Sequence, residues 1–413
     1  MSKTGLSKQR LTRLDDLMRS RYVDTGRLPG ILTMICRGGE IAHLGMSGHI
    51  DLERGKKMRE DAIFRIYSMS KPVTAVALMM LVEEGLIGLD DDVATHIPQF
   101  KNLGVYATGM PALIPGPIAY ITTPPQRPMK VIDLASHTSG MTYHFMNRTA
   151  VDAGYRRLNV AAMNTEDGLD TMIEQLATLP LEFSPGTKWN YSVSIDVLGY
   201  LVQKLSGQTF GEFLRTRLFE PLGMTDTAFF CPESKRDRYA SCYMPAQGGG
   251  ITLQDDAGAS TFAEPPKLES GGAGLVSTAH DYMRFCRMLL NKGTLDGVQI
   301  LSPKSVALFS LNFLPGNAEL GDLAPPGMFS EAGYSGTGFS LACGVNIDVA
   351  RTRLPGTTGE FFWGGAASTA FWVDPKEDLA VVFMTQVIGS DARLTLRRDL
   401  RTLVYSAMTE SFA

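Results

Sequence analysis

The sequence predicts an α/β (α+β) fold. An antiparallel sheet, built from both ends of the chain and flanked by the terminal helices, is joined to a mainly helical lobe. The chain has 413 residues, and a single hydrophobic core seldom grows beyond about 250–300 residues. Strand-like segments gather at both ends and helix-like segments lie between them. The apolar fraction of 44% and the charged fraction of 20% are ordinary for a globular protein.

The elements expected for the sheet lie at the two ends of the chain. Residues 7–22 carry leucines and a methionine at helical spacing, and residues 30–36 and 40–48 are expected as strands around a Gly-Gly turn. Near the C-terminus, strands are expected at residues 340–349, 359–363, 368–373 and 379–386, and a helix at residues 391–408. Each end therefore supplies strands and one flanking helix.

The middle of the chain is mainly helical by its pattern. Helices are expected at residues 73–86, 169–178, 194–206, 210–218 and 280–291. Pro- and Gly-rich loops, at residues 109–128 and 245–266, separate some of them. The predicted division is a discontinuous α/β domain of residues 1–62 and 269–413 and a helical domain of residues 63–268, with an active site in the cleft between them.

Charge and composition narrow the range of partners. The net charge is −4 and no basic patch stands out, so nucleic acid is not expected as a partner. The N-terminal residues have no apolar run behind their positive charges, and the apolar stretch at residues 73–82 is too short to span a bilayer. We therefore expect a cytoplasmic enzyme that does not bind membranes. The five cysteines include no CxxC pair, so zinc is not suggested and free thiols are expected.

A short motif offers a nucleophile. Ser68 and Lys71 form an S-x-x-K pattern, which is expected about once by chance in a chain of this length. The context is more specific than the pattern. Pro72 is tolerated only in the first turn of a helix, and the apolar residues 73–82 that follow predict a buried helix. The helix must therefore begin close to Ser68.

This placement suits nucleophilic chemistry. A serine at a helix N-terminus lies where the helix dipole favours developing negative charge, and Lys71 lies one turn further on the same face. A serine hydroxyl needs a base to take its proton, and burial can lower the pKa of a lysine enough to supply one. The alternative is a helix-capping serine with a surface lysine. Ser70 is a rival nucleophile but has no lysine three residues downstream.

Two later segments carry further candidates. Tyr191 follows a turn and precedes a helix-like run, so its phenol can point into a cleft and move protons beside a lysine. The alternative for a lone tyrosine is a packing role. Gly364 and Gly365 lie at the start of a strand, where they allow close approach of a ligand or another backbone. The alternative there is a bulge or a tight turn.

Together these motifs resemble the class C β-lactamases and their esterase relatives, the family VIII carboxylesterases. Further similar stretches are residues 133–141, 219–227 and 271–278. The resemblance implies the serine β-lactamase and penicillin-binding-protein fold, with Ser68 as the acylated nucleophile and with Lys71 and Tyr191 as general base and acid. It also implies an oxyanion hole made by the backbone N–H groups of Ser68 and Ala366. The substrate-binding residues that it implies are Trp363, Gly364, Gly365 and Val193.

Two departures from the β-lactamase pattern concern the substrate. Trp363 stands where β-lactamases carry the lysine of a Lys-Thr-Gly motif, so an anionic substrate loses a charge-assisted contact. Val193 stands where the tyrosine motif usually has an asparagine that would contact a substrate amide. Both departures favour neutral esters over β-lactams and peptides.

The histidines do not suggest a different mechanism. No G-x-S-x-G motif of a Ser-His-Asp esterase is present. His137 is expected to be a structural hydrogen-bonding residue, and the spacing of the other histidines does not suggest a metal site. No metal and no cofactor are therefore expected.

The sequence predicts a carboxylesterase that hydrolyses short- to medium-chain esters through a Ser68 acyl-enzyme. An acyltransferase of the same fold is an alternative that the motifs do not separate. A weak β-lactamase or D-aminopeptidase is disfavoured by Trp363 and Val193. A non-catalytic penicillin-binding-like scaffold has no need of all three of Ser68, Lys71 and Tyr191. The natural ester and the oligomeric state are left open.

Overall fold

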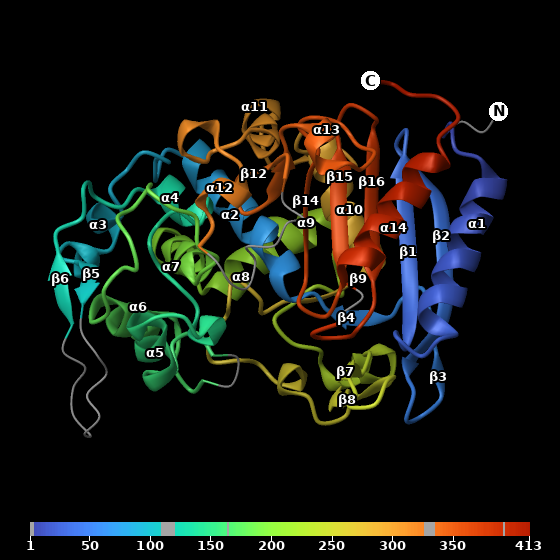
Figure 1. Cartoon of the computed structure of the whole chain (residues 1–413), viewed down its shortest axis with the longest axis horizontal. Helices are drawn as coiled ribbons and strands as arrows, with labels where there is room; N and C mark the ends of the chain where they lie inside the picture. The colour runs from blue at the N-terminus through green and yellow to red at the C-terminus, as the bar shows by residue number, and fades with distance from the viewer. Residues whose placement is uncertain (1–3, 109–119, 163–164, 326–334, 391–392) are drawn as a thin grey trace.

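The central feature of the molecule is an eight-stranded antiparallel sheet with the strand order β12-β13-β14-β15-β16-β1-β2-β3 (Figure 1). A computed structural model describes residues 4–108, 120–162, 165–325, 335–390 and 393–413. The strands are β1 Gly30–Arg37, β2 Glu40–Asp51, β3 Lys56–Lys57, β12 Thr337–Phe339, β13 Gly344–Asn346, β14 Phe361–Gly364, β15 Ala370–Asp374 and β16 Leu379–Met384. β1 pairs with β16, so the two ends of the chain join in one sheet, which confirms the predicted fold class.

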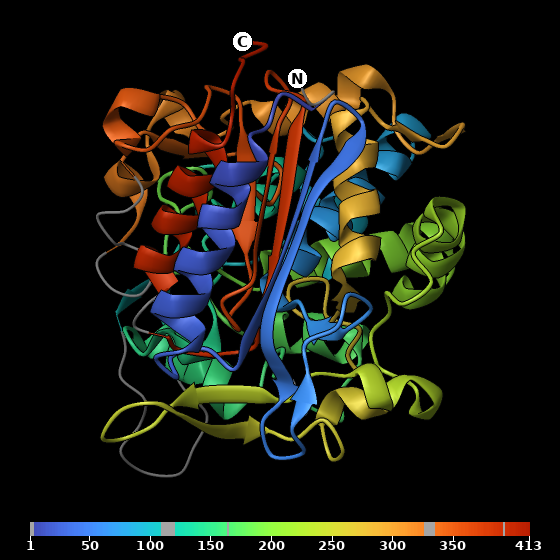
Figure 2. The same cartoon turned by 90° about the vertical axis from the view of Figure 1, so that its right-hand side faces the viewer.

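Helices cover both faces of this sheet. α1 (Lys8–Met18) and α14 (Arg393–Ser406) lie side by side on one face, and α10 (Ala279–Leu290) lies on the other (Figure 2). The residues of β16 alternate strictly between the two cores, with Val381 in the core beneath the terminal helices and Val382 in the core beneath α10. Successive strand residues point to opposite faces, and both faces are buried. This is why β16 reads as a continuous apolar run.

The middle of the chain packs around one buried helix. α2 (Ser70–Glu83) is buried from Ser70 to Leu81, as its apolar sequence predicts. It packs against α7 (Ser194–Ser206). Other helices of this region are α4 Val131–Ala135, α5 Ala150–Arg157, α6 Leu169–Ala177 and α8 Phe210–Leu214. The domain boundaries at residues 62/63 and 268/269 stay a prediction.

One predicted strand was wrong in part. Residues 340–349 were expected as a single strand, but β12 ends at Phe339 and β13 begins at Gly344. The turn between them contains Ala342 with a left-handed φ of +58°, and its residues are buried. Turns are usually marked by glycine, proline or polar residues. Residues 341–343 are apolar, so the sequence pattern resembled a continuous strand. Part of the predicted loop 109–128, at residues 109–119, lies outside the described residues.

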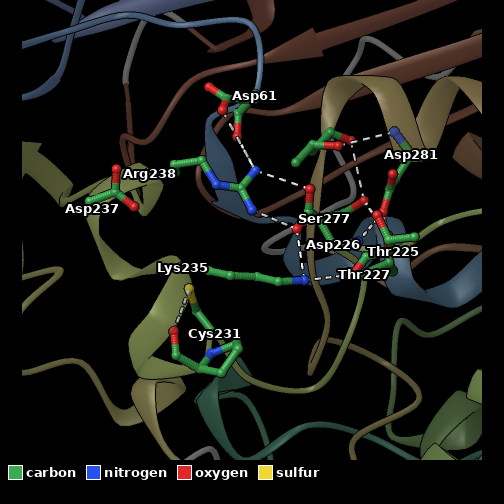
Figure 3. Close-up of polar contacts among 12 residues, drawn as sticks. Asp61, Thr225, Asp226, Thr227, Cys231, Lys235, Asp237, Arg238, Ser277 and Asp281 are labelled. Carbon is green, nitrogen blue, oxygen red and sulfur yellow. Dashed lines mark hydrogen bonds and ion pairs between the residues drawn. The ribbon is translucent and has the colours of Figure 1, made fainter.

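A polar network fastens the segment that leads to Ser68 (Figure 3). The short strand β4 (Ile63–Arg65) pairs with β9 (Val276–Thr278). The guanidinium of Arg238 donates to both carboxylate oxygens of Asp226, at 3.0 and 2.7 Å, and to the backbone oxygen of Asp61 at 2.9 Å. Thr227 shares a hydrogen bond with Ser277 on β9 at 2.8 Å. The network therefore contacts β9 at Ser277 and the chain just before β4 at Asp61.

The cysteines and the helices also bear on the predictions made from composition. All five cysteines are buried and form no disulfide, as expected for free thiols. Within the described part of the chain, no helix combines the length and the apolar character needed to cross a membrane.

Candidate active site

Ser68 lies in a tight connection between a strand and a helix. β4 ends at Arg65, a 3-10 turn covers Tyr67–Met69, and α2 begins at Ser70. The backbone of Tyr67 has a left-handed φ of +43°, a conformation uncommon for residues other than glycine and often found at functional sites. The side chain of Ser68 is partly exposed. The predicted start of the helix close to Ser68 is therefore observed, and Ser68 is not fully buried.

Lys71 is buried beside this hydroxyl. Its ammonium nitrogen donates to Ser68 Oγ at 3.3 Å and to the backbone oxygen of Gly272 at 2.7 Å. The residue is only 1% exposed, so the alternative of a surface lysine is wrong. Burial lowers the pKa of Lys71 to about 7, against the opposing pull of the Asp196 carboxylate. A substantial fraction of Lys71 is therefore uncharged near neutral pH and able to accept a proton.

Asp196 also lies at this site, although no sequence motif pointed to it. It lies in the first turn of α7 and is 1% exposed. One carboxylate oxygen accepts hydrogen bonds from the Ser270 hydroxyl and from the Gly272 N–H. The backbone of Gly272 thus links the two groups, because its carbonyl accepts from Lys71 and its N–H donates to Asp196. The one signal in the sequence is a single acidic residue inside an otherwise apolar helical run.

The pair of Lys71 and Asp196 predicts a pH dependence. An amine that is protonated cannot take the Ser68 proton, so kcat/KM should fall about tenfold per unit as the pH drops below about 7. Asp196→Asn should move this acidic limb to lower pH, because the Asp196 carboxylate raises the pKa of Lys71. Measuring kcat/KM from pH 5 to 9 checks both claims, with Asp170→Asn on the exposed face of α6 as the control. An acidic limb that stays in place in Asp196→Asn would contradict the coupling.

Tyr191 reaches the same site from another segment. Its ring centroid lies 4.4 Å from the Lys71 ammonium nitrogen, and the residue is 3% exposed. Its hydroxyl accepts a hydrogen bond from the indole N–H of Trp363 at 3.2 Å. The structure therefore brings Ser68, Lys71, Tyr191 and Trp363 together, although they are far apart in the sequence.

The Gly-Gly segment lies against the Ser68 turn. A Cβ on Gly365 would sit 2.4 Å from the backbone oxygen of Ile66, two residues before Ser68, so only glycine allows this approach. A Cβ on Gly364 would instead meet the guanidinium of Arg397 at 2.0 Å. Ala366 follows in the turn after β14, beyond the last residue paired with β15, and is partly exposed. Ala366 therefore follows directly on Gly365, the residue that approaches the backbone of Ile66, and the position of its N–H in an oxyanion hole stays a prediction.

Val193, a predicted substrate-binding residue, and Ser70, the rival nucleophile, are both buried. Val193 precedes α7, and its backbone oxygen accepts from the N–H groups of Asp196 and Val197 at 2.9 and 3.1 Å. Its side chain is 0% exposed, so its contact with substrate stays a prediction. The hydroxyl of Ser70 accepts from the Leu275 N–H at 3.1 Å and is buried. Ser70 is therefore held in a structural contact.

The hydrogen bond from Trp363 adds a role to the apolar one expected from sequence. With Tyr191 in the proton-moving role that the sequence predicts, Trp363→Phe should lower kcat roughly tenfold or more. A hydrogen bond to a charged group contributes about 1.5–3 kcal/mol, and each 1.36 kcal/mol is a factor of ten. Chain-length preference should change as well. The free energy of unfolding should fall by no more than about 2 kcal/mol. Steady-state kinetics on an ester panel and thermal unfolding test this, and an unchanged kcat would contradict it.

Comparisons with known proteins give similarity over nearly the whole chain. Protein Rv1367c of Mycobacterium tuberculosis (strain ATCC 25618 / H37Rv) is 35% identical over 367 residues, which covers 88% of this chain and 87% of the relative. Esterase EstB of Burkholderia gladioli is 30% identical over 409 residues, which covers 95% and 93%. The solved structure of EstCE1, described as a hydrolase with promiscuous acyltransferase activity, has a TM-score of 0.79, 25% identity and coverage of 96% and 99%.

A family model covers the same extent. The model named Beta-lactamase matches residues 14–405. This span contains every strand of the eight-stranded sheet, the helical region in the middle of the chain and every site residue described above. The chain therefore belongs to the Beta-lactamase family.

Proposed function

We propose that this protein is a serine carboxylesterase that hydrolyses short- to medium-chain carboxylic esters through an acyl-enzyme on Ser68. The observation that carries the proposal is the buried Lys71 amine, which lies 3.3 Å from Ser68 Oγ and 4.4 Å from the ring centroid of Tyr191. A pKa of about 7 leaves this amine able to act as a base near neutral pH. Membership of a family of serine hydrolases and the similarity to Esterase EstB support the assignment.

The first half-reaction forms the acyl-enzyme. Neutral Lys71 takes the Ser68 proton while Oγ attacks the ester carbonyl carbon, and the resulting oxyanion is bound by the N–H groups of Ser68 and Ala366. The carbon–oxygen bond to the alcohol then breaks. Tyr191 gives its proton to the departing alkoxide and regains one from Lys71, so the alcohol leaves neutral. Trp363, which donates to the Tyr191 hydroxyl at 3.2 Å, stabilises the phenolate that forms in passing.

The second half-reaction reverses these roles. A water molecule enters where the alcohol left, and Tyr191 with Lys71 accepts its proton as its oxygen attacks the acyl carbon. The bond between the acyl carbon and Ser68 Oγ breaks, and Oγ recovers its proton from Lys71. The carboxylic acid leaves and the starting state is restored. The same two side chains therefore act as base and acid in both steps.

The surroundings of Tyr191 favour neutral substrates. In place of a lysine, Trp363 contributes a ring and one N–H, and that N–H is engaged by Tyr191. A cation that would pair with a substrate carboxylate is therefore missing at this position. We infer a preference for neutral, apolar esters over β-lactams and peptides.

The test combines labelling with a substrate panel. A serine-directed phosphonate should add its mass to the peptide that contains Ser68, and p-nitrophenyl esters of increasing chain length should be hydrolysed faster than a cephalosporin or a D-peptide amide. Labelling on another serine would contradict the nucleophile. Nitrocefin turnover comparable to that of p-nitrophenyl butyrate would contradict the substrate class.

An acyltransferase is the second candidate. The observation that favours it is the similarity to EstCE1, a hydrolase with promiscuous acyltransferase activity. In that case an alcohol, rather than water, would attack the acyl carbon on Ser68. Product analysis with an added alcohol acceptor separates the two: a dominant new ester in the presence of water would favour the transferase.

A further inference from the structure

His137 is a buried titratable residue that the mechanism above does not use. It follows α4, has a left-handed φ of +57° and is 0% exposed. Burial holds the pKa of His137 well below its usual value, and the nearby Lys71 lowers it further, so the imidazole is neutral at neutral pH. Its Nε2 finds no hydrogen-bond partner among the described residues. Burying a polar atom without a hydrogen-bond partner lowers the stability of the folded state. The other contacts of His137 must offset this cost.

His137 contacts Tyr191 and both of its neighbours along the chain. The backbone oxygen of His137 accepts from the N–H of Asn190 at 2.9 Å, one residue before Tyr191. Its Nδ1 shares a hydrogen bond of 3.1 Å with the hydroxyl of Ser192, one residue after Tyr191. The imidazole ring lies 4.8 Å from the Tyr191 ring, centroid to centroid. One residue thus holds the neighbours of Tyr191 and packs against its ring.

A second pair of contacts fixes the Ser192 hydroxyl. It shares a hydrogen bond of 2.7 Å with the hydroxyl of Ser194, which shares another of 2.6 Å with Ser139. Ser139 Oγ in turn accepts from the N–H of Met141 at 3.1 Å. All three serines are buried. The partner of His137 Nδ1 is therefore itself immobilised, so the segment around Tyr191 cannot move independently of residues 137–141.

We propose that His137 is a positioning residue that holds the Tyr191 phenol against Lys71 and Trp363. The proposal rests on the role given to Tyr191 in the proposed function. The phenol must lie close enough to Lys71 to exchange protons with it and must keep its contact with Trp363. A displacement of about 1 Å at a catalytic group can cost roughly 100-fold in rate, and His137 supplies the contacts that prevent it.

A pair of substitutions separates positioning from packing. His137→Asn keeps an amide at the place of Nδ1, and asparagine tolerates a left-handed φ, so the bond to Ser192 can persist without the ring. His137→Leu keeps bulk and loses the bond. We expect kcat to fall roughly 10- to 100-fold in the leucine variant with KM changed less than about twofold, and the asparagine variant to recover a substantial part. The acidic limb set by Lys71 should stay in place in both.

Ser192→Ala provides a second route if the leucine variant does not fold. It removes the partner of Nδ1 with a minimal change in volume and should lower kcat in the same direction with KM preserved. His144→Leu, a partly buried histidine on a neighbouring turn, is the control and should leave kcat unchanged. All rates are divided by the concentration of folded protein, measured by thermal unfolding and circular dichroism.

The outcomes that overturn the proposal are distinct from failure of the proposed function. A kcat per folded molecule within about twofold of the parent in both His137→Leu and Ser192→Ala would show that His137 is only structural. Equal loss in the leucine and asparagine variants would overturn the role of the Ser192 hydrogen bond. Phosphonate labelling away from Ser68 in the parent protein would instead remove the proposed function, and with it the role of Tyr191 on which this proposal rests, whatever the rates of the His137 and Ser192 variants.

Discussion

Ser68→Ala should abolish ester hydrolysis, with kcat lowered on the order of 10⁴-fold or more. The substitution removes the one hydroxyl that both accepts from Lys71 at 3.3 Å and is partly exposed to an incoming ester. The cost to folding should be small, about 1 kcal/mol or less, because Ser68 is not fully buried and, among the described residues, no backbone N–H donates to its hydroxyl. Hydrolysis of p-nitrophenyl butyrate and thermal unfolding, measured on the same preparation, check both parts.

Ser70→Ala is the matched control for this result. Its hydroxyl accepts from the Leu275 N–H at 3.1 Å in a buried setting, so its loss leaves a backbone donor unpaired and should cost about 1–3 kcal/mol of stability. Most of the activity should remain. The two serines are therefore expected to show opposite effects, one on rate and the other on stability. Loss of activity in Ser70→Ala with retention in Ser68→Ala would reassign the nucleophile.

Lys71→Met should lower kcat about 10³-fold while the protein stays folded. General base catalysis by a positioned side chain contributes about 10²–10⁴-fold, and methionine fills a similar volume without an amine. The loss of stability should be modest, because the substitution also removes the cost of burying the amine, the cause that lowers the pKa of Lys71 to about 7. Initial rates at pH 8, where the parent lysine is mostly neutral, together with thermal unfolding, provide the measurement.

Lys71→Arg separates charge from basicity. A guanidinium retains hydrogen-bond donors for Gly272 and Ser68 but stays protonated in proteins, so it cannot take the Ser68 proton. It should be as inactive as the methionine variant. An arginine variant with more than about one tenth of the parent rate would mean that Lys71 acts by its positive charge and not as a base.

Much of the fold could be predicted from local patterns of apolar residues in the sequence. The run of apolar residues after Pro72 predicted a buried helix, and α2 is buried from Ser70 to Leu81. The strand patterns at both ends predicted one sheet, and β1 pairs with β16. The boundary that failed, at residues 340–343, did so because a buried turn can be made from apolar residues when the surrounding core supplies the burial.

The site was only partly accessible from the sequence. Ser68, Lys71 and Tyr191 could be proposed from short motifs, and the structure places them together. Asp196 could not, because its significance depends on Gly272, a residue 76 positions away that bridges it to Lys71. The sequence indicated only an apolar role for the Trp363 indole. The hydrogen bond from its N–H to the Tyr191 hydroxyl is visible only in the structure.

By itself, the sequence determined what depends on neighbours along the chain. The separation of Ser68 and Lys71 by three residues at the start of a helix follows from the sequence, as does the apolar character of the helix that begins at Ser70 and carries Lys71. Only the tertiary structure decided the basicity of Lys71 and the surroundings of Tyr191. Those properties come from removing an amine from water and from setting it beside a carboxylate and a phenol that lie more than a hundred residues away, and such distances are fixed by packing.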